Sequence, residues 1–295
     1  MSMKKKLHIG RLALPYAMVI PTMILLAVFV FYPLVNMVYL SFFDYNLLKE
    51  KTFCGFDNYY RLFFVQKDFW QAMKNTLIYM AGVTLFVIFL GLVFALWLQR
   101  DKRINSLVQR VMFLPHICSG LAIALIFQWL MDDEGLFNAV LGFFNIPALR
   151  WLNSSTTSLL SIMIVAIWKG IGYYALILLS SVKAIPTELM EAADLDDAGK
   201  LRTFFKITLP MLSPQLFFLL ITITINTFKV FDIVRLMTGG GPGNSSDVLV
   251  YYIYRYSIEY NKYGLACAAG TVLLVILLIL TLIYFRIVGR RVHYQ

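Results

Sequence analysis

Long apolar runs, separated by short charged segments, dominate the pattern of this chain. No charged residue stands between Arg11 and Asp44, and apolar runs of similar length recur towards the C-terminus. A helix that crosses a bilayer needs about 20 mostly apolar residues, and open sheet edges are not tolerated in hydrocarbon. The pattern therefore predicts six membrane-spanning helices, over residues 14–40, 75–98, 111–131, 159–182, 209–236 and 263–285.

The composition agrees with an all-α, polytopic membrane protein. Of the 295 residues 60% are hydrophobic and 14% charged, whereas soluble domains are about half apolar and about a quarter charged. A soluble enzyme, a disordered protein and a secreted disulfide scaffold are thereby excluded. Cys54, Cys118 and Cys267 are far apart, so neither a disulfide framework nor a zinc site is indicated. We expect a single transmembrane domain over 1–295, whose first apolar run is an uncleaved span.

Lysine and arginine are divided unequally between the two sides of this predicted topology. Fifteen lie on the side that holds both termini, and eight lie on the other side. Cytoplasmic segments of membrane proteins carry the excess of basic residues. Both termini are therefore predicted to be cytoplasmic, and the net charge of +10 needs no nucleic-acid partner.

Motifs that would carry catalysis are missing from the sequence. The glycine-rich run at 239–243 lacks the lysine of a phosphate-binding loop, and no HExxH is present. The three histidines are dispersed, and no nucleophile–base pattern is found. We therefore expect no catalytic residue and no metal site in this chain.

The longest cytoplasmic segment, residues 184–210, has the pattern of a helix–turn–helix. Residues 188–195 have helical spacing with a start at Pro186–Glu188, where Thr187 or nearby polar groups are expected to cap the helix. Residues 196–199 have turn chemistry. Residues 201–209 resume a helix. An apolar ridge beside a charged face favours docking of a soluble partner; the alternative is a solvated loop.

This segment resembles the EAA loop of ATP-binding-cassette (ABC) importer permeases. The matching residues, in the family's order, are Glu191, Ala192, Ala193, Asp196, Ala198, Gly199, Phe204, Ile207, Leu209 and Pro210. Asp197 departs from the pattern, because it stands where the family has a turn glycine, and Gly199 is expected to supply the turn instead. The stretches 231–234 and 237–242 resemble the end of span five in maltose-type sugar permeases.

The resemblance implies a type I ABC importer permease in a bacterial cell membrane. Such a subunit moves a sugar by alternating access, together with a second permease subunit, two ATPase subunits and an external solute-binding protein. ATP and Mg are held by the ATPase subunits, so no cofactor is expected on this chain. The resemblance assigns ATPase coupling to Glu191, Ala192, Ala193, Asp196, Gly199 and Pro210. The rival class is a secondary transporter or channel subunit driven by ion gradients, which needs an acidic or histidine relay across the spans; Asp232 is the single acid within a predicted span.

Polar and ionisable residues within the spans are the candidates for solute contact, because they are costly there and usually face a cavity or a partner. Their side chains and backbone supply the flat surfaces and hydrogen-bonding groups that a sugar needs. The resemblance places solute contacts in the same parts of spans three to five. The candidates are His116, Gly120, Lys169, Gly170, Tyr173, Asn226, Thr227 and Lys229.

Each candidate has a structural alternative. His116 could satisfy a backbone carbonyl freed by Pro115, and Tyr173 could simply pack between helices. Lys229 could pair with Asp232, three residues later, or reach the membrane surface.

Lys169 is the hardest of these residues to explain structurally. No acid lies in its own span, and a lysine at the centre of a span costs about 2.5–3.5 kcal/mol on insertion scales. If Lys169 and Lys229 both face the path, two cations against Asp232 leave it net positive. The solute is then expected to be an acidic sugar, such as a sialic or uronic acid; alternatively, Lys169 pairs with an acid on the second permease.

Overall fold

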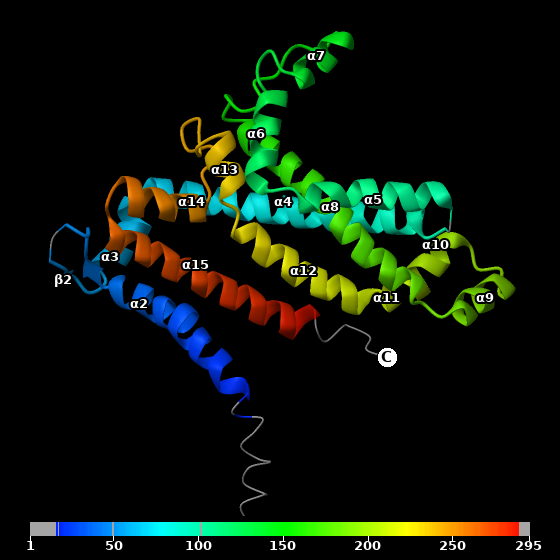
Figure 1. Cartoon of the computed structure of the whole chain (residues 1–295), viewed down its shortest axis with the longest axis horizontal. Helices are drawn as coiled ribbons and strands as arrows, with labels where there is room; N and C mark the ends of the chain where they lie inside the picture. The colour runs from blue at the N-terminus through cyan, green and yellow to red at the C-terminus, as the bar shows by residue number, and fades with distance from the viewer. Residues whose placement is uncertain (1–15, 17, 49, 101, 289–295) are drawn as a thin grey trace, which may run out of the picture. The chain divides into compact units, whose positions relative to one another are not determined.

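The computed structural model describes residues 16, 18–48, 50–100 and 102–288. In this part of the chain helices dominate, and the strands form one antiparallel pair, β1 (Phe43–Asp44) and β2 (Thr52–Phe53), with Phe43 opposite Phe53. The chain divides into two compact units, each described by itself. Unit 1 comprises residues 1–65 and 253–272, and unit 2 comprises 66–252 and 273–295. The all-α class is confirmed (Figure 1).

Unit 1 contains the first span and a short region that follows it. Its helices are η1 (Ala27–Phe31), α2 (Tyr32–Leu40), α3 (Asp57–Tyr60), η2 (Arg61–Val65), η4 (Arg255–Glu259) and the first half of α15 (Tyr263–Ile283). The helical run Met18–Leu40 has none of its apolar residues buried by the chain itself. Most side chains of this span are therefore left uncovered by the rest of the chain.

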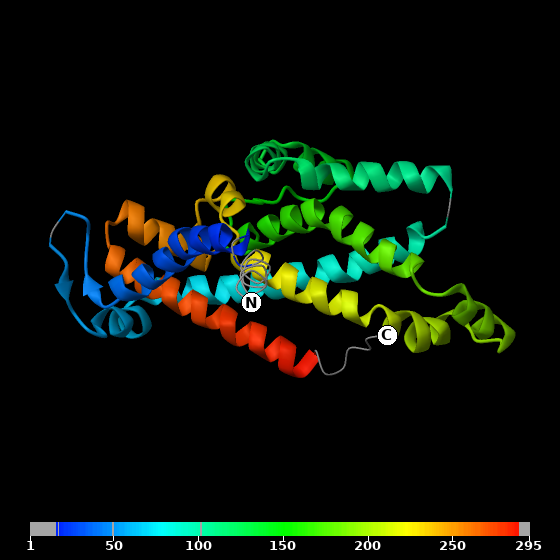
Figure 2. The ribbon, with the colours of Figure 1, turned by 60° about the horizontal axis from the view of Figure 1, so that its bottom comes forward.

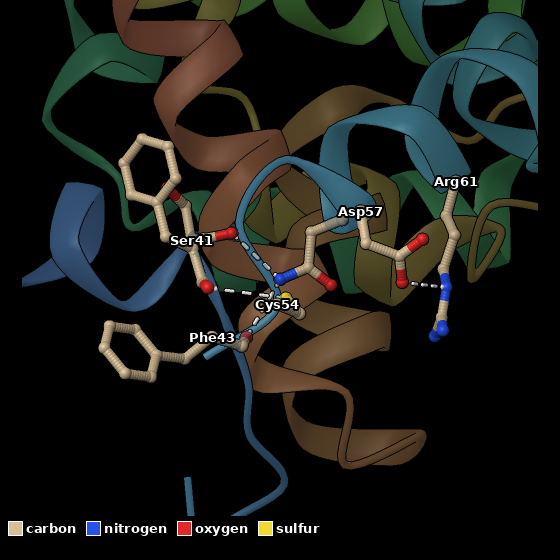
Figure 3. A network of polar contacts seen from close by, with 7 residues as sticks. Ser41, Phe43, Cys54, Asp57 and Arg61 are labelled. Atoms are coloured by element: carbon tan, nitrogen blue, oxygen red, sulfur yellow. Dashed lines mark hydrogen bonds and ion pairs between the residues drawn. The ribbon is translucent and has the colours of Figure 1, made fainter. Parts of the chain in front are cut away.

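A network of polar contacts ties α3 to the end of α2 (Figure 3). The Asn58 side chain donates to the carbonyl oxygens of Ser41 and Phe43, both at 2.9 Å, and the hydroxyls of Ser41 and Tyr59 are 2.6 Å apart. The Cys54 thiol donates to the Phe42 carbonyl at 3.4 Å, and burial raises the pKa of this thiol. The network satisfies the backbone groups that the end of α2 leaves unpaired.

Unit 2 contains all or most of each of the other helices, and five of these line the candidate site. The other helices are α4 (Lys67–Leu98), α5 (Arg103–Ile117), α6 (Gly120–Leu130), α7 (Leu136–Phe143), α8 (Ser158–Lys183), α9 (Thr187–Leu195), α10 (Lys200–Thr203), η3 (Phe204–Thr208), α11 (Leu209–Met211), α12 (Ser213–Phe228), α13 (Asp232–Met237), α14 (Leu249–Tyr254) and η5 (Tyr284–Val288). Helix α4 packs along α8, α5 packs on α8, and α12 packs on α4 (Figures 1 and 2). Helix α13 packs on α6.

Within the described ranges, five helices are long and apolar enough to cross a membrane: Met18–Leu40, Lys67–Leu98, Ser158–Lys183, Ser213–Met237 and Tyr263–Arg286. They correspond to five of the predicted spans. The second begins at Lys67 rather than at residue 75, and residues 14, 15 and 17 of the first prediction lie outside the described residues.

The prediction of one continuous helix over 111–131 is wrong. The structure has two helices here, α5 and α6, which meet at an angle of 100°. Pro115 cannot donate a backbone hydrogen bond within α5, and Cys118 and Ser119 have extended backbones, with ψ of 143° and 137°. If the bent pair is counted as one span, the described part of the chain has up to six spans.

Hydrogen bonds from α4 hold the loop that follows the glycine-rich segment at 239–243. Loop residues just after it are held by α4, because the buried Asn75 side chain donates to the carbonyl oxygens of Asn244 and Asp247, at 3.0 and 2.8 Å. The Thr76 hydroxyl accepts a hydrogen bond from the Leu249 backbone at 2.8 Å. Two buried polar side chains of a spanning helix thus fix the loop.

Helices α5 and α8 approach each other at a glycine. A Cβ added at Gly172 would overlap the backbone carbonyl of Met112, which cannot move as a flexible side chain could. Small residues at such points let membrane helices pack backbone to backbone.

We predict that Gly172→Ala lowers the thermal stability of the purified protein by several degrees. Overpacking costs about 1–3 kcal/mol, and an overlap with a backbone oxygen belongs at the upper end, above the gain of about 1 kcal/mol from replacing a helical glycine by alanine. Gly142→Ala is the matched control, since a Cβ at Gly142 meets nothing within 4 Å. A thermal midpoint for Gly172→Ala at or above that of the control would contradict the close approach.

Candidate functional site

A cavity of about 260 Å³ lies among the spanning helices of unit 2. Helices α4, α5, α8, α12 and α13 contribute to its wall. Most of the wall is apolar, with polar groups at a few positions, as expected for a small-molecule site. The lining residues are Tyr79, Val83, Val87, His116, Ala166, Lys169, Gly170, Tyr174, Ile223, Asn226, Thr227, Val230 and Ile233.

The structure brings together most of the predicted candidates. His116, Lys169, Gly170, Asn226 and Thr227 line this cavity. The other three candidates do not. Tyr173 stacks on a lining residue, Gly120 begins α6, and Lys229 follows the last residue of α12.

Two tyrosines of the wall were not among the candidates. Tyr79 lies on α4, a span from which the sequence suggested no contact, and Tyr174 lies next to the candidate Tyr173. Nothing in the sequence separates them from the other 15 of the 17 tyrosines. Tyr79 faces the cavity because of the rotation of α4 about its own axis relative to α8. A hydropathy profile carries no information on this rotation.

His116 and Tyr174, which line the cavity, belong to a cluster of stacked rings. The rings of His116 and Tyr173 are 4.0 Å apart and within 6° of parallel. Phe113 lies beside both, at 6.0 and 6.5 Å, and Tyr174 meets Tyr173 edge to face at 5.0 Å. His116 therefore contributes a flat surface, and no hydrogen bond of its side chain to a freed carbonyl is found among the described residues.

Asn226 and Thr227 bring hydrogen-bonding groups from α12. The Asn226 amide donates to the Tyr174 hydroxyl over 3.5 Å, and the Thr227 hydroxyl donates to the Thr224 carbonyl at 2.8 Å. The amide oxygen of Asn226 and the lone pairs of the Thr227 hydroxyl remain available as acceptors.

Lys169 forms hydrogen bonds with the C-terminal end of α5, where the third predicted span is interrupted. Its ammonium group donates to the carbonyl oxygens of Cys118, His116 and Pro115, at 2.9, 3.2 and 3.4 Å. The last carbonyl groups of a helix lack partners within it and carry the negative end of its dipole. Lys169 thus caps α5, which is a role that the sequence did not suggest.

On the other side of the break, Asp232 lies beside the N-terminus of α6. A Cβ added at Gly120, the first residue of α6, would lie 3.8 Å from the Asp232 carboxylate. A negative charge is favourable near a helix N-terminus. The two helix ends at the break therefore lie beside charges of opposite sign to their own, and no ion pair between Asp232 and Lys229 is found in the part of the chain that the structure describes.

Charge in the cavity is set by Lys169. It is the one charged side chain among the described residues that line the wall. The three carbonyl oxygens solvate its ammonium group but do not neutralise it. Over the described ranges, no three His, Cys, Asp or Glu side chains come together in a way that could hold a metal ion.

The segment 184–210 has the predicted helix–turn–helix, in α9 and in α10 with η3. Helix α9 begins after Pro186 and no side chain caps it, so the expected cap at Thr187 is wrong. The expectation that Gly199 supplies the turn is also wrong. Asp197 itself takes the left-handed conformation, with φ of 49°, whereas Gly199 has φ of −59°. Aspartate adopts this conformation more readily than most residues.

The predicted coupling residues do not all face outward. Glu191, Ala192, Asp196 and Gly199 are exposed, Pro210 is half-buried and Ala193 is buried. The Ala193 carbonyl accepts a hydrogen bond from the Ala198 backbone at 2.9 Å, so Ala193 belongs to the packing of the turn. The exposed apolar surface comes from Leu195, Leu201 and Phe205.

Comparison with known proteins identifies the family. Residues 87–294 match the family described as the binding-protein-dependent transport system inner membrane component. The chain is 35% identical to the probable ABC transporter permease protein YurN of Bacillus subtilis, over 92% of this chain and 95% of YurN. It is 30% identical to the trehalose/maltose transport system permease protein MalF of Thermococcus litoralis, over 98% of both chains.

A solved structure agrees with these relatives. The chain is similar to a subunit of a bacterial ABC transporter involved in the import of the acidic polysaccharide alginate, with a TM-score of 0.85 and 26% identity, over 97% of this chain and 99% of the other. The predicted resemblance, the permease fold and the assignment to transport rather than catalysis are thus confirmed. The chain belongs to the family of inner-membrane components of binding-protein-dependent transport systems and is a permease of the ABC importer type.

Proposed function

We propose that this chain is one of two permease subunits of an ABC importer and that it moves a sugar through the cavity of unit 2. The observation that carries the proposal is the combination, in one cavity, of an aromatic wall with the amide and hydroxyl groups of Asn226 and Thr227. Sugars bind to such surfaces through ring stacking and hydrogen bonds. A trehalose/maltose permease and an alginate importer among the similar proteins support a sugar.

An ion-gradient-driven transporter remains the alternative function. It would need a chain of acidic or histidine groups along the path. Among the described lining residues His116 is the sole group of that kind, and its ring is stacked on Tyr173. Membership of a binding-protein-dependent family favours the ABC importer instead.

The assembly that we propose has a second permease, two ATPase subunits and an external solute-binding protein. ATP and Mg would bind to the ATPase subunits, and the segment 184–210 would transmit their movement. The exposed side chains of Leu195, Leu201 and Phe205 are suited to an apolar contact with such a partner. Both termini would lie in the cytoplasm, as the distribution of lysine and arginine indicates.

We further propose that the solute is an acidic sugar. The charge of Lys169 is not cancelled by another charged lining residue, and opposite charges in contact near a protein surface attract by about 4 kcal/mol. The named cargo of the alginate importer is also acidic. A neutral sugar would gain hydrogen bonds alone.

The first prediction concerns coupling to the ATPase. Leu195→Asp should reduce solute-stimulated ATP hydrolysis at least tenfold, because a buried, unpaired charge in an interface costs about 2–5 kcal/mol. Leu195 is 87% exposed, so the variant should insert and fold normally. Phe143→Asp on α7, where Phe143 is 83% exposed, is the control and should keep stimulated hydrolysis. Wild-type hydrolysis and copurification for Leu195→Asp would exclude the docking role.

The second prediction concerns topology. With Cys54, Cys118 and Cys267 replaced by serine, a membrane-impermeant maleimide should label Phe143→Cys in intact cells. It should label Leu201→Cys only after the cells are lysed. The cells for this measurement lack the ATPase, so that no ATPase covers this residue. Labelling of Leu201→Cys in intact cells would reverse the proposed orientation and with it the coupling role.

The third prediction concerns the charge of the solute. Lys169→Gln removes the charge but keeps a donor for the carbonyl groups of α5, whereas Lys169→Met removes both. Uptake of an acidic sugar should fall at least tenfold in Lys169→Gln, with thermal stability close to that of the wild type. Lys169→Met should lose stability as well.

Lys229→Met is the matched control, since Lys229 does not line the cavity, and its uptake should change less than that of Lys169→Gln. Wild-type uptake of the acidic sugar by Lys169→Gln, or a cognate binding protein that prefers neutral sugars, would refute the acidic solute. It would leave the ABC importer itself unaffected.

A further inference from the structure

Unit 1 exposes a line of aromatic side chains on the segment formed by α3 and η2. Phe56, Tyr60 and Phe64, here called the aromatic ridge, are 74%, 60% and 78% exposed. Their spacing of four residues places them on one face, and the rings of Tyr60 and Phe64 are 5.2 Å apart. The opposite face is buried, with Asn58 at 3% and Leu62 at 0% exposure. The segment is therefore amphipathic, and its apolar face has no cover from the described residues of unit 1.

Two spanning helices fix the depth of this segment. Asn58 donates to the carbonyl oxygens of Ser41 and Phe43, directly after the last residue of α2 (Figure 3). On the other side, the backbone of Gly264, near the start of α15, donates to the Tyr45 carbonyl at 3.1 Å. A Cβ at Gly264 would overlap the Phe43 carbonyl, so the backbones are in direct contact. The segment is thus held at the level where one span ends and another begins.

Basic side chains accompany the aromatic rings at this level. Arg61 is exposed beside the ridge and forms an ion pair of 2.8 Å with Asp57 (Figure 3). The Lys51 ammonium group lies 5.2 Å from the centre of the Tyr39 ring. Aromatic residues with long cationic side chains are enriched at the membrane–water interface, where rings lie among the headgroups and cations reach phosphate and water.

The neighbouring span favours lipid as the occupant of this face. None of the apolar window of Met18–Leu40 is buried by the chain itself, so the span whose end holds the ridge segment is an uncovered membrane helix. A short amphipathic helix at the end of such a span has the geometry of an interfacial helix.

We propose that the aromatic ridge lies in the lipid headgroup region, at the level where α2 ends, and that α3 and η2 form an interfacial helix that anchors unit 1 to the bilayer. The proposal needs a membrane-spanning chain but depends neither on the solute nor on which side of the membrane is cytoplasmic.

The test measures the surroundings of the ridge in the assembled transporter, in nanodiscs of phosphatidylethanolamine and phosphatidylglycerol. Cys54, Cys118 and Cys267 are replaced by serine, and a nitroxide is attached to Phe64→Cys or, separately, to Tyr60→Cys. Collisions with oxygen, which concentrates in lipid, are compared with collisions with a nickel chelate, which stays in water. Val28→Cys, in the middle of the first span and 51% exposed, is the lipid reference, and free nitroxide in buffer is the water reference.

At both ridge positions we expect oxygen accessibility of at least half the Val28 value and nickel accessibility below a third of the water value. Nickel accessibility near the water value would show a solvated ridge and overturn the proposal. Low accessibility to both reagents would also overturn it, because the ridge would then be covered by the second permease or by the binding protein. Repetition with and without the binding protein separates these two covers.

Discussion

Every backbone polar group within a bilayer must find a partner in the protein, and the site of this permease depends on how that requirement is met at one break. Helix α5 ends at Ile117 in a region that hydropathy assigns to a continuous span, which leaves carbonyl oxygens without helical partners. Lys169 supplies the donors from α8. A cation at mid-span is costly by itself, but here three carbonyl dipoles and the end of a helix solvate it.

The same contact holds the parts of the cavity wall in place. Because Lys169 donates a hydrogen bond to the carbonyl group of His116, the position of the imidazole ring depends on α8, which also carries Tyr173. The close backbone approach at Gly172 lies three residues further along α8 and also holds α5 against α8. Capping, ring stacking and helix packing thus converge on one stretch of α8, so the residues proposed to contact solute also stabilise the helix packing.

Much of the fold could be predicted from the sequence, because the segments that cross a membrane are determined by long apolar runs. Five of the spans, the helix–turn–helix at 184–210 and most of the polar cavity wall followed from apolar runs and from a few costly residues within them. The break after Ile117 could not be predicted, since Pro115 is compatible with a kinked but continuous helix. The capping role of Lys169 was missed because its partners are backbone groups of another helix. A search for acidic side chains cannot find them.

The turn between α9 and α10 shows what a single backbone angle contributes to mechanical behaviour. Asp197 takes φ of 49° at a position where a glycine is usual in resembling permeases. A glycine there would have a wide choice of backbone angles, whereas an aspartate has a narrow one. At this residue the turn therefore has fewer accessible backbone angles than a glycine would give it, which limits how far the chain can bend there between α9 and α10.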